Sequence, residues 1–141
     1  MKKILFVILA FLVSSGAYAQ ALKIGDEVHG GIVAYIDESG DHGLVCSLED
    51  LVWGEWEEAK EACAEYSFMG KNDWYLPSKD ELNLLYVNLH KKGLGDFTNN
   101  NYWSSTEYNI DLAWRQLFAN GNQNYYSKSS LKYIVRAVRA F

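Results

Sequence analysis

The segment DWYLPSKDE, residues 73–81, carries the start signal of a helix and fixes where the regular structure of the chain changes. Ser78 is followed three residues later by Glu81, which is the spacing of a capping box. In such a box each side chain satisfies an otherwise unpaired backbone N–H of the other residue. Pro77 keeps Leu76 extended, because a residue before proline avoids the helical region. The sequence therefore predicts an extended segment up to Leu76 and a helix that begins after Ser78.

Two helices are predicted in the middle of the chain. Over residues 55–68, apolar side chains recur three and four positions apart and glutamates occupy many of the other positions. This is the pattern of an amphipathic helix with an acidic face, and Gly70 is its predicted stop. The second helix follows Ser78 and ends near Gly93 and Gly95. Its apolar stripe consists of Leu82, Leu85, Tyr86 and Leu89.

Strands are predicted before and after these helices. The β-branched and aromatic run at 31–36 and the run at 44–47 flank a cluster of turn-forming residues, which predicts a hairpin. After the helices, the predicted strands are 102–106, 112–119, 122–128 and 133–141. Asn120-Gly121 is a strong two-residue turn signal between two of them. Because strands and helices are segregated along the chain, the predicted fold class is α+β.

The N-terminal residues have the three-part pattern of a secretory signal peptide. Lys2 and Lys3 precede an apolar run at 4–13, and small residues lead to Ala17-Tyr18-Ala19. The run is too short for a membrane-spanning helix, which needs about 20 residues. We therefore expect a signal peptide at 1–19, no membrane span after its cleavage, and one domain at 20–141 in the periplasm or outside the cell.

Charge and motif content limit the possible functions. The formal net charge is −5, and removal of residues 1–19, which hold two lysines and no acid, leaves a formal charge of −7. An acidic domain argues against nucleic acid as a partner, because phosphate binding requires clustered Lys and Arg. The sequence has no nucleophile elbow, phosphate-binding glycine loop or zinc-binding helix motif. We expect no catalytic residue, metal or cofactor, and an enzyme is the minority alternative.

Two cysteines, Cys46 and Cys63, are present. An even pair in an oxidising compartment predicts a disulfide. The alternative is two buried free thiols that act as small hydrophobic side chains.

Two arginines near the C-terminus, Arg136 and Arg139, are three positions apart. On one continuous strand they would point to opposite faces, so we expect at least one of them to be inward and paired. Asp80 and Glu81 are the candidate partners.

Several phrases recur in one order and together resemble the Lcl C-terminal domain family, named for the terminal domain of a bacterial collagen-like adhesin. The phrases are residues 30–33, 73–78, 102–106, 113–114 and 135–139, and the resemblance extends over 24–141. It implies a C-type-lectin-like α+β domain with two helices against a small antiparallel sheet and a ligand-facing C-terminal half. The family's best-known activity is adhesion, including binding to sulfated glycans. The calcium-binding tripeptides of many such lectins are missing here, so we expect no calcium-dependent sugar binding.

The C-terminal half is dense in amide and aromatic side chains, which suit neutral sugars or peptide loops. Trp74, Trp103 and Trp114 are assigned to the core, with one of them open as a surface platform. The predicted ligand-binding residues are Asn109, Asp111, Gln116, Asn122, Gln123, Asn124 and Tyr125. The sequence thus favours an exported non-catalytic recognition or adhesion domain that binds a glycan or protein. The alternative is a structural or assembly component of the envelope without a small ligand, and the oligomeric state stays open.

Overall fold

The computed structural model describes residues 20–141, and the predicted signal peptide at 1–19 lies outside the described residues. Its fold class is α+β, as predicted. The four-stranded sheet has the order β1 (Glu27–Val28), β2 (Gly31–Ile36), β3 (Gly43–Cys46) and β9 (Val138–Ala140). The five-stranded sheet has the order β4 (Trp53–Gly54), β8 (Tyr133–Ile134), β5 (Asn101–Glu107), β6 (Leu112–Leu117) and β7 (Gln123–Ser127). Neighbouring strands are antiparallel except β5 and β8, which are parallel.

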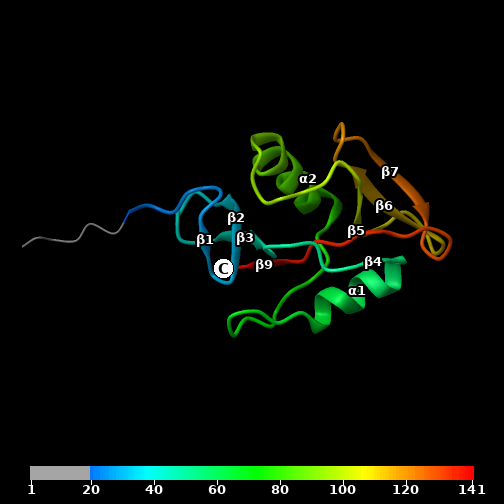
Figure 1. Ribbon diagram of the computed structural model, residues 1–141, viewed down its shortest axis with the longest axis horizontal. Coiled ribbons are helices and arrows are strands. Elements are labelled where there is room, and N and C mark those ends of the chain that lie inside the picture. Colours follow the sequence, from blue (N-terminus) through cyan, green and yellow to red (C-terminus); the bar gives the residue numbers. More distant parts are fainter. Residues whose placement is uncertain (1–19) are drawn as a thin grey trace, which may run out of the picture.

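Two α-helices cover the strands from opposite sides (Figure 1). They are α1 (Trp56–Glu65) and α2 (Lys79–Asn88), and a short 3₁₀ helix, η1 (His90–Lys92), follows α2. No helix within residues 20–141 is both long and apolar enough to cross a membrane.

The capping box at the start of α2 is confirmed. The Ser78 hydroxyl accepts a hydrogen bond from the backbone N–H of Glu81 at 3.1 Å, and the Glu81 carboxylate accepts one from the backbone N–H of Ser78 at 3.0 Å. The other carboxylate oxygen of Glu81 accepts a hydrogen bond from the Tyr75 hydroxyl at 2.7 Å. The extended segment before the cap is thereby tied to the first turn of α2.

The strands contribute to two apolar cores, one under each helix. Successive side chains of a strand point to opposite faces, so Val33 packs in one core while Ile32 and Ala34 pack in the other. The α2 core consists of Ile32, Ala34, Leu44, Cys46, Leu82, Leu85, Leu89, Tyr102, Phe118, Ile134 and Val138. The α1 core consists of Val33, Val45, Trp56, Ala59, Cys63, Trp74, Leu76, Trp103, Ala113, Val135 and Ala137. The core assignment of Trp74 and Trp103 is therefore confirmed.

The predicted disulfide is wrong. Cys46 and Cys63 are both free and buried, and they belong to different cores. Cys46 points from β3 toward α2, whereas Cys63 lies on α1 on the other side of the sheets, so their side chains do not meet. Burial raises the pKa of the Cys46 thiol to about 11 and that of the Cys63 thiol to about 12. The alternative of two buried free thiols holds instead.

The predicted single strand at 133–141 is divided between the two sheets. β8 pairs with β4 and β5, whereas β9 pairs with β3. The three residues between them, Val135, Arg136 and Ala137, are buried while the chain crosses from one sheet to the other. The alternation of a single strand therefore does not apply here, and both arginines turn inward.

Arg136 is buried between the two sheets. Its guanidinium forms an ion pair with Asp50 at 2.8 Å and donates to the backbone carbonyls of Ser47 at 3.0 Å and Gly95 at 2.8 Å. The guanidinium carbon lies 4.0 Å from the centroid of the Phe97 ring. The buried charge is therefore compensated by one carboxylate, several carbonyls and one aromatic face.

Arg139 is paired with Asp73 at 2.6 Å and also donates to the backbone carbonyl of His29 at 3.0 Å. The predicted partners, Asp80 and Glu81, are wrong for both arginines. Glu81 is used in the capping box and Asp80 is exposed on the first turn of α2.

The hairpin between β6 and β7 is confirmed, but its turn is longer than two residues. The backbone N–H of Leu117 donates to the carbonyl of Asn122 at 2.9 Å, which leaves residues 118–121 as the connection. Only Gly121 in this turn has a left-handed φ, at 81°. The longer turn allows Phe118 to reach the α2 core.

Candidate functional site

The seven residues predicted to bind a ligand lie on two neighbouring parts of the five-stranded sheet. Asn109 and Asp111 belong to the loop between β5 and β6, and Gln116 lies in β6. The other residues, Asn122, Gln123, Asn124 and Tyr125, lie immediately before or within β7. The sheet order places all of them near one edge, because β7 is the last strand on that side.

Gln116 and Gln123 are used inside the fold. Gln116 is fully buried, and its amide nitrogen donates to the Asn83 side chain at 2.9 Å and to the carbonyl of Gly121 at 3.0 Å. The Gln123 amide nitrogen donates to the carbonyl of Lys79 at 2.8 Å and to the Gln116 side chain at 3.3 Å. These amides hold the β6–β7 hairpin against α2, and Gln116 has no surface to offer a ligand.

The loop between β5 and β6 is held by Lys128. Its ammonium donates to the Glu107 carboxylate at 2.7 Å and to the carbonyls of Asn109 at 3.0 Å and Ile110 at 2.8 Å. The hydrogen bond from Lys128 also holds the pKa of Glu107 below its ordinary value. The Asn109 side chain accepts from the backbone N–H of Asp111 at 2.9 Å. Asn109 therefore shapes the loop.

An aromatic cluster of Tyr108, Trp114 and Tyr125 lies on the surface at this edge of the sheet. The rings of Tyr108 and Tyr125 are stacked, with centroids 3.7 Å apart and an angle of 6° between their planes. Trp114 meets Tyr125 edge-on, with centroids 5.2 Å apart, and the ammonium of Lys79 lies 3.5 Å from the Trp114 ring centroid. The hydrogen bond with Tyr108 raises the pKa of Tyr125. Tyr108 is 51% exposed, so the outer ring of the stack reaches solvent.

The sequence prediction included Tyr125 but missed Tyr108 and Lys79. It assigned Trp114 to the core with the other two tryptophans and left one of the three open as a surface platform. In the structure Trp114 pairs with Tyr125 across the hairpin and is only partly buried. A two-residue turn at 120–121 would have paired Trp114 with a residue other than Tyr125. The turn signal in the sequence therefore did not predict this pair. Tyr108 carries no local signal, because its position depends on the irregular pairing that ends β5.

The exposed polar residues do not all lie beside the aromatic cluster. Asn124 precedes Tyr125 in β7 and so points to the other face of the strand, and Asn122 lies in the turn just before β7. The Asn124 side chain turns back and accepts from the backbone N–H of Tyr125 at 2.8 Å. Asp111 is exposed on the loop that also carries Tyr108. The structure thus places Tyr125 in the aromatic cluster and Asp111 on the loop that leads from Tyr108 to β6, while Asn124 lies on the other face of β7.

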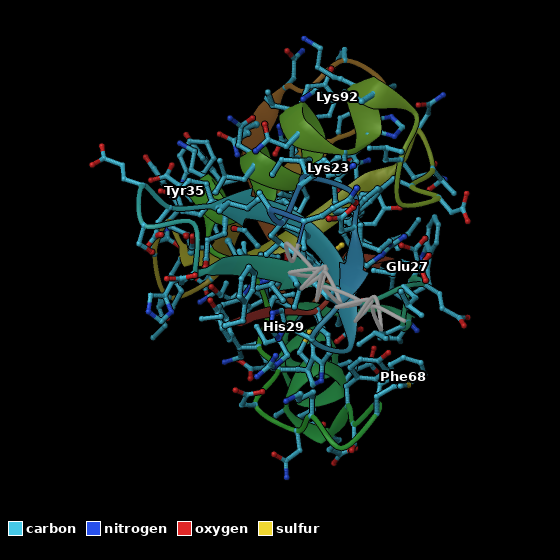
Figure 2. All side chains as sticks on the ribbon, turned by 90° about the vertical axis from the view of Figure 1, so that its left-hand side faces the viewer. Lys23, Glu27, His29, Tyr35, Phe68 and Lys92 are labelled. Carbon is cyan, nitrogen blue, oxygen red and sulfur yellow. The ribbon has the colours of Figure 1, made fainter. Side chains whose placement is uncertain are left out.

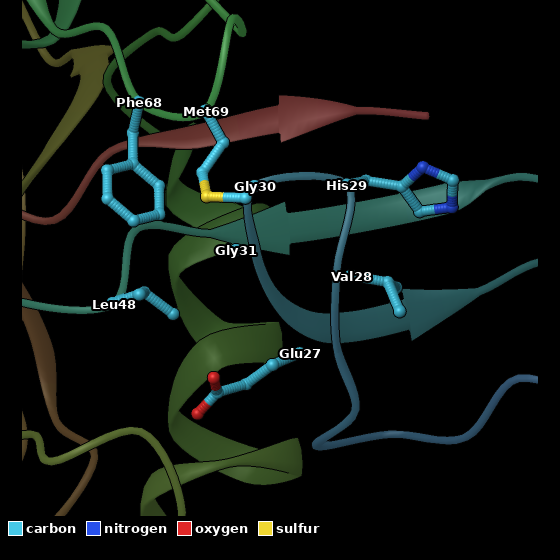
Figure 3. A pocket seen from close by; sticks show the side chains of 8 residues that line it. All are labelled: Glu27, Val28, His29, Gly30, Gly31, Leu48, Phe68 and Met69. Atoms are coloured by element: carbon cyan, nitrogen blue, oxygen red, sulfur yellow. The ribbon is translucent and has the colours of Figure 1, made fainter.

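A separate apolar pocket of about 280 Å³ lies at the opposite end of the molecule. Figure 2 shows that end, with Glu27, His29 and Phe68 labelled. The pocket is lined by the β1–β2 turn together with Leu48, Phe68 and Met69. Figure 3 shows Phe68 and Met69 side by side above it, whereas the ring of His29 points away.

The three histidines form no cluster around a common centre, although His29 and His42 both contact Phe141. His29 stacks on Phe141 with ring centroids 4.5 Å apart, and the His42 ring lies 3.2 Å from the carbonyl oxygen of Phe141. The His90 ring is hydrogen-bonded to Asn99 at 3.0 Å. Within residues 20–141, His, Cys, Asp and Glu side chains form no group of three that could hold a metal ion.

Comparison with known proteins supports the resemblance noted in the sequence. No curated protein matches the chain. Residues 36–139 match the family described as the Lcl C-terminal domain. This match spans β3 to β8, both helices and most of β9, and therefore includes the aromatic cluster. The chain belongs to the Lcl C-terminal domain family.

Proposed function

We propose that residues 20–141 form an exported, non-catalytic recognition domain that binds a glycan or a protein at the cell envelope or outside the cell. The family membership supports a location outside the cytoplasm. Within this proposal the α+β fold is a variant of the C-type-lectin-like architecture. The ligand lies against the aromatic cluster of Tyr108, Trp114 and Tyr125.

The observation that carries this proposal is the stacked pair of Tyr108 and Tyr125 at the surface. Stacking fixes the orientation of both rings before a ligand arrives, and Trp114 supports the pair from the side. Rigid aromatic side chains offer a large contact area at a low cost in conformational entropy. A flat apolar ring face suits the C–H face of a sugar or an apolar side chain of a protein.

The groups around the cluster supply polar contacts. The Lys79 ammonium offers a charged donor beside the Trp114 ring, and the exposed Asp111 on the Tyr108 loop offers an acceptor of opposite charge. The loop that carries Tyr108 is held by the three hydrogen bonds of Lys128. Because the loop is already ordered, ligand binding costs little conformational entropy there. The N–H of Tyr125 is already occupied by Asn124, which disfavours a mode in which a partner strand extends the sheet.

The test compares Tyr108→Ala and Tyr125→Ala with Tyr35→Ala. Tyr35 is 42% exposed but lies on β2 in the other sheet, so it is a matched control for the loss of a surface tyrosine. Each protein is screened on a glycan array and used to capture proteins from an envelope extract. We expect one glycan or one protein ligand to be lost in both cluster variants and retained in the control.

Two other results would count against this surface. A ligand that all three variants retain would place recognition elsewhere on the domain. A stable protein partner that tolerates both cluster substitutions, with no glycan bound by any variant, would favour the structural or assembly role.

A further inference from the structure

Two tight turns border the apolar pocket of Figure 3. The β1–β2 turn has His29 and Gly30 at its centre, with φ of 55° and 80°. In the second turn, Phe68 and Lys71 exchange two backbone hydrogen bonds, and the central pair is Met69 at 51° and Gly70 at 75°. Two left-handed central residues define the tight hairpin turn that favours Asn or Gly at these positions.

Met69 is an unfavourable residue for its place in this turn. A side chain with a Cβ is strained in the left-handed region, and short polar residues tolerate that region better than methionine does. The Met69 side chain is 76% exposed, so it gains little from burial. The fold therefore receives no compensation for the strain from packing, and the thioether is left open to solvent at the mouth of the pocket.

Met69 holds the one accessible sulfur within residues 20–141. The other sulfur atoms of this part of the chain belong to Cys46 and Cys63, and both residues are fully buried. Burial also raises the pKa of each thiol, which keeps the reactive thiolate scarce at neutral pH. An oxidant in the surrounding solution thus meets the thioether first.

We propose that Met69 is an oxidation site of this protein, at which the thioether sulfur takes one oxygen atom from a peroxide. The sulfur lone pair attacks the nearer peroxide oxygen, an S–O bond forms and the O–O bond breaks. The other peroxide oxygen leaves, after proton transfer, as water from hydrogen peroxide or as an alcohol from an organic peroxide. The sulfur is oxidised to the sulfoxide by two electrons and the peroxide is reduced by two. A sulfoxide reductase reverses the change.

Oxidation changes the chemistry of the pocket. The sulfoxide oxygen is a strong hydrogen-bond acceptor. Met69 lies beside Phe68 (Figure 3) and lines the pocket together with Val28 and Leu48. An apolar wall becomes a polar one while the surrounding fold stays as it is. This site lies at the other end of the molecule from the aromatic cluster and is independent of the proposed function.

The test treats the purified native protein with hydrogen peroxide and maps the products by peptide mass spectrometry. We expect the peptide that contains Met69 to gain the mass of one oxygen atom, at a rate close to that of an N-acetylated methionine amide in the same solution. Met69→Leu should show no gain in that peptide. Iodoacetamide should leave Cys46 and Cys63 unlabelled in the native oxidised protein and label both after unfolding.

Two results would overturn the proposal. One is a Met69 thioether that resists peroxide in the native protein but reacts after unfolding. The other is first oxidation at Cys46, Cys63 or the exposed Trp53. The melting temperature gives a second readout, because oxidation of a surface thioether should leave it unchanged. A large fall in melting temperature that Met69→Leu prevents would show that the thioether packs within the fold, and would equally refute a surface site.

Discussion

Arg136 is the most constrained charge in the structure, because its side chain is fully buried while that of Asp50 is 27% exposed. Replacement by methionine would leave the carbonyls of Ser47 and Gly95 without their donor and Asp50 without its cation. Removal of one partner from a buried pair costs about 3–5 kcal/mol. We expect Arg136→Met to lower the free energy of unfolding by that amount in urea denaturation.

The control for this prediction is Lys132→Met, which removes an exposed cation near the same end of the chain. Surface substitutions of this kind usually change stability by less than about 0.5 kcal/mol. If the two variants are equally stable, the ion pair and hydrogen bonds of Arg136 contribute nothing to the free energy of unfolding beyond the packing of its side chain.

Asp73 makes stability depend on pH. The hydrogen bond from Arg139 holds the pKa of Asp73 below its ordinary value in the folded protein. A carboxyl whose folded pKa is depressed contributes its stability above the unfolded pKa, and this contribution is lost as the pH falls through the folded pKa. The affected window therefore begins below about pH 4, where an unperturbed aspartate is protonated.

We expect Asp73→Asn to weaken the fall in the free energy of unfolding as the pH is lowered through this window, as measured by urea unfolding. Asp80→Asn serves as the control, because Asp80 is also exposed but its neighbour Glu81 makes the capping contacts. A fall that Asp80→Asn weakens as much as Asp73→Asn does would contradict the role of the Arg139 pair.

At the level of single residues, the sequence predicted which side chains are buried better than it predicted their partners. It indicated that an arginine near the C-terminus turns inward, but the partners are Asp50 and Asp73, which lie 86 and 66 positions away. No local pattern encodes a contact of that separation. The two cysteines show the same limit, since their spacing is suitable for a bridge but the strands direct them to different cores.

The turn at 68–71 gives a prediction at the level of the element. Asparagine tolerates the left-handed region and favours the first position of this turn type. Because Met69 is exposed, its replacement sacrifices little apolar contact. We expect Met69→Asn to raise the free energy of unfolding by roughly 0.5–1 kcal/mol, because asparagine recovers part of the roughly 1–2 kcal/mol that the left-handed region costs a residue with a longer side chain. Met69→Leu keeps the strain and should leave stability unchanged. A destabilised Met69→Asn would show that the side chain is held by contacts.

The elements with strong local signals were predicted well. The capping box, the two helices and the first hairpin all rest on residues within a few positions of one another, and the structure confirms that these elements exist. The end of the first helix was predicted too late, because α1 ends at Glu65 and Gly70 lies in the turn at 68–71. The segment 133–141 was predicted as one strand because its composition favours strands throughout. Its division depends on the separation of the two sheets, which is a tertiary property. The length of the β6–β7 turn likewise depends on Phe118, which packs under α2.

At the level of the whole molecule, the candidate site forms only because residues from the β5–β6 loop, from two paired strands and from the start of α2 meet. Tyr108 follows β5, Trp114 and Tyr125 lie on paired strands, and Lys79 begins α2. The sequence predicted a ligand-binding region in the C-terminal third of the chain because amide and aromatic residues are concentrated there. It could not distinguish Gln116, which is fully buried, from the exposed polar residues beside it. Buried and exposed amide side chains look alike in a sequence.

The two cores should unfold together, because β2, β3 and β5 contribute side chains to both. Leu82 in the α2 core and Leu76 in the α1 core are matched sites, with 0% and 3% of their surfaces exposed. We expect Leu82→Ala and Leu76→Ala each to cost about 2–5 kcal/mol and to leave the slope of the free energy against urea concentration unchanged.

Tryptophan fluorescence makes the test sharp, because the three most buried tryptophans all lie in the α1 core: Trp56, Trp74 and Trp103. If the strands couple the cores, Leu82→Ala in the α2 core must shift the fluorescence transition as far as it shifts the far-ultraviolet circular dichroism transition. Coincident transitions are the mark of two-state unfolding. A fluorescence midpoint that stays in place while the dichroism midpoint falls would show that α2 and its core unfold separately, and the shared strands would then not join the two halves into one cooperative unit.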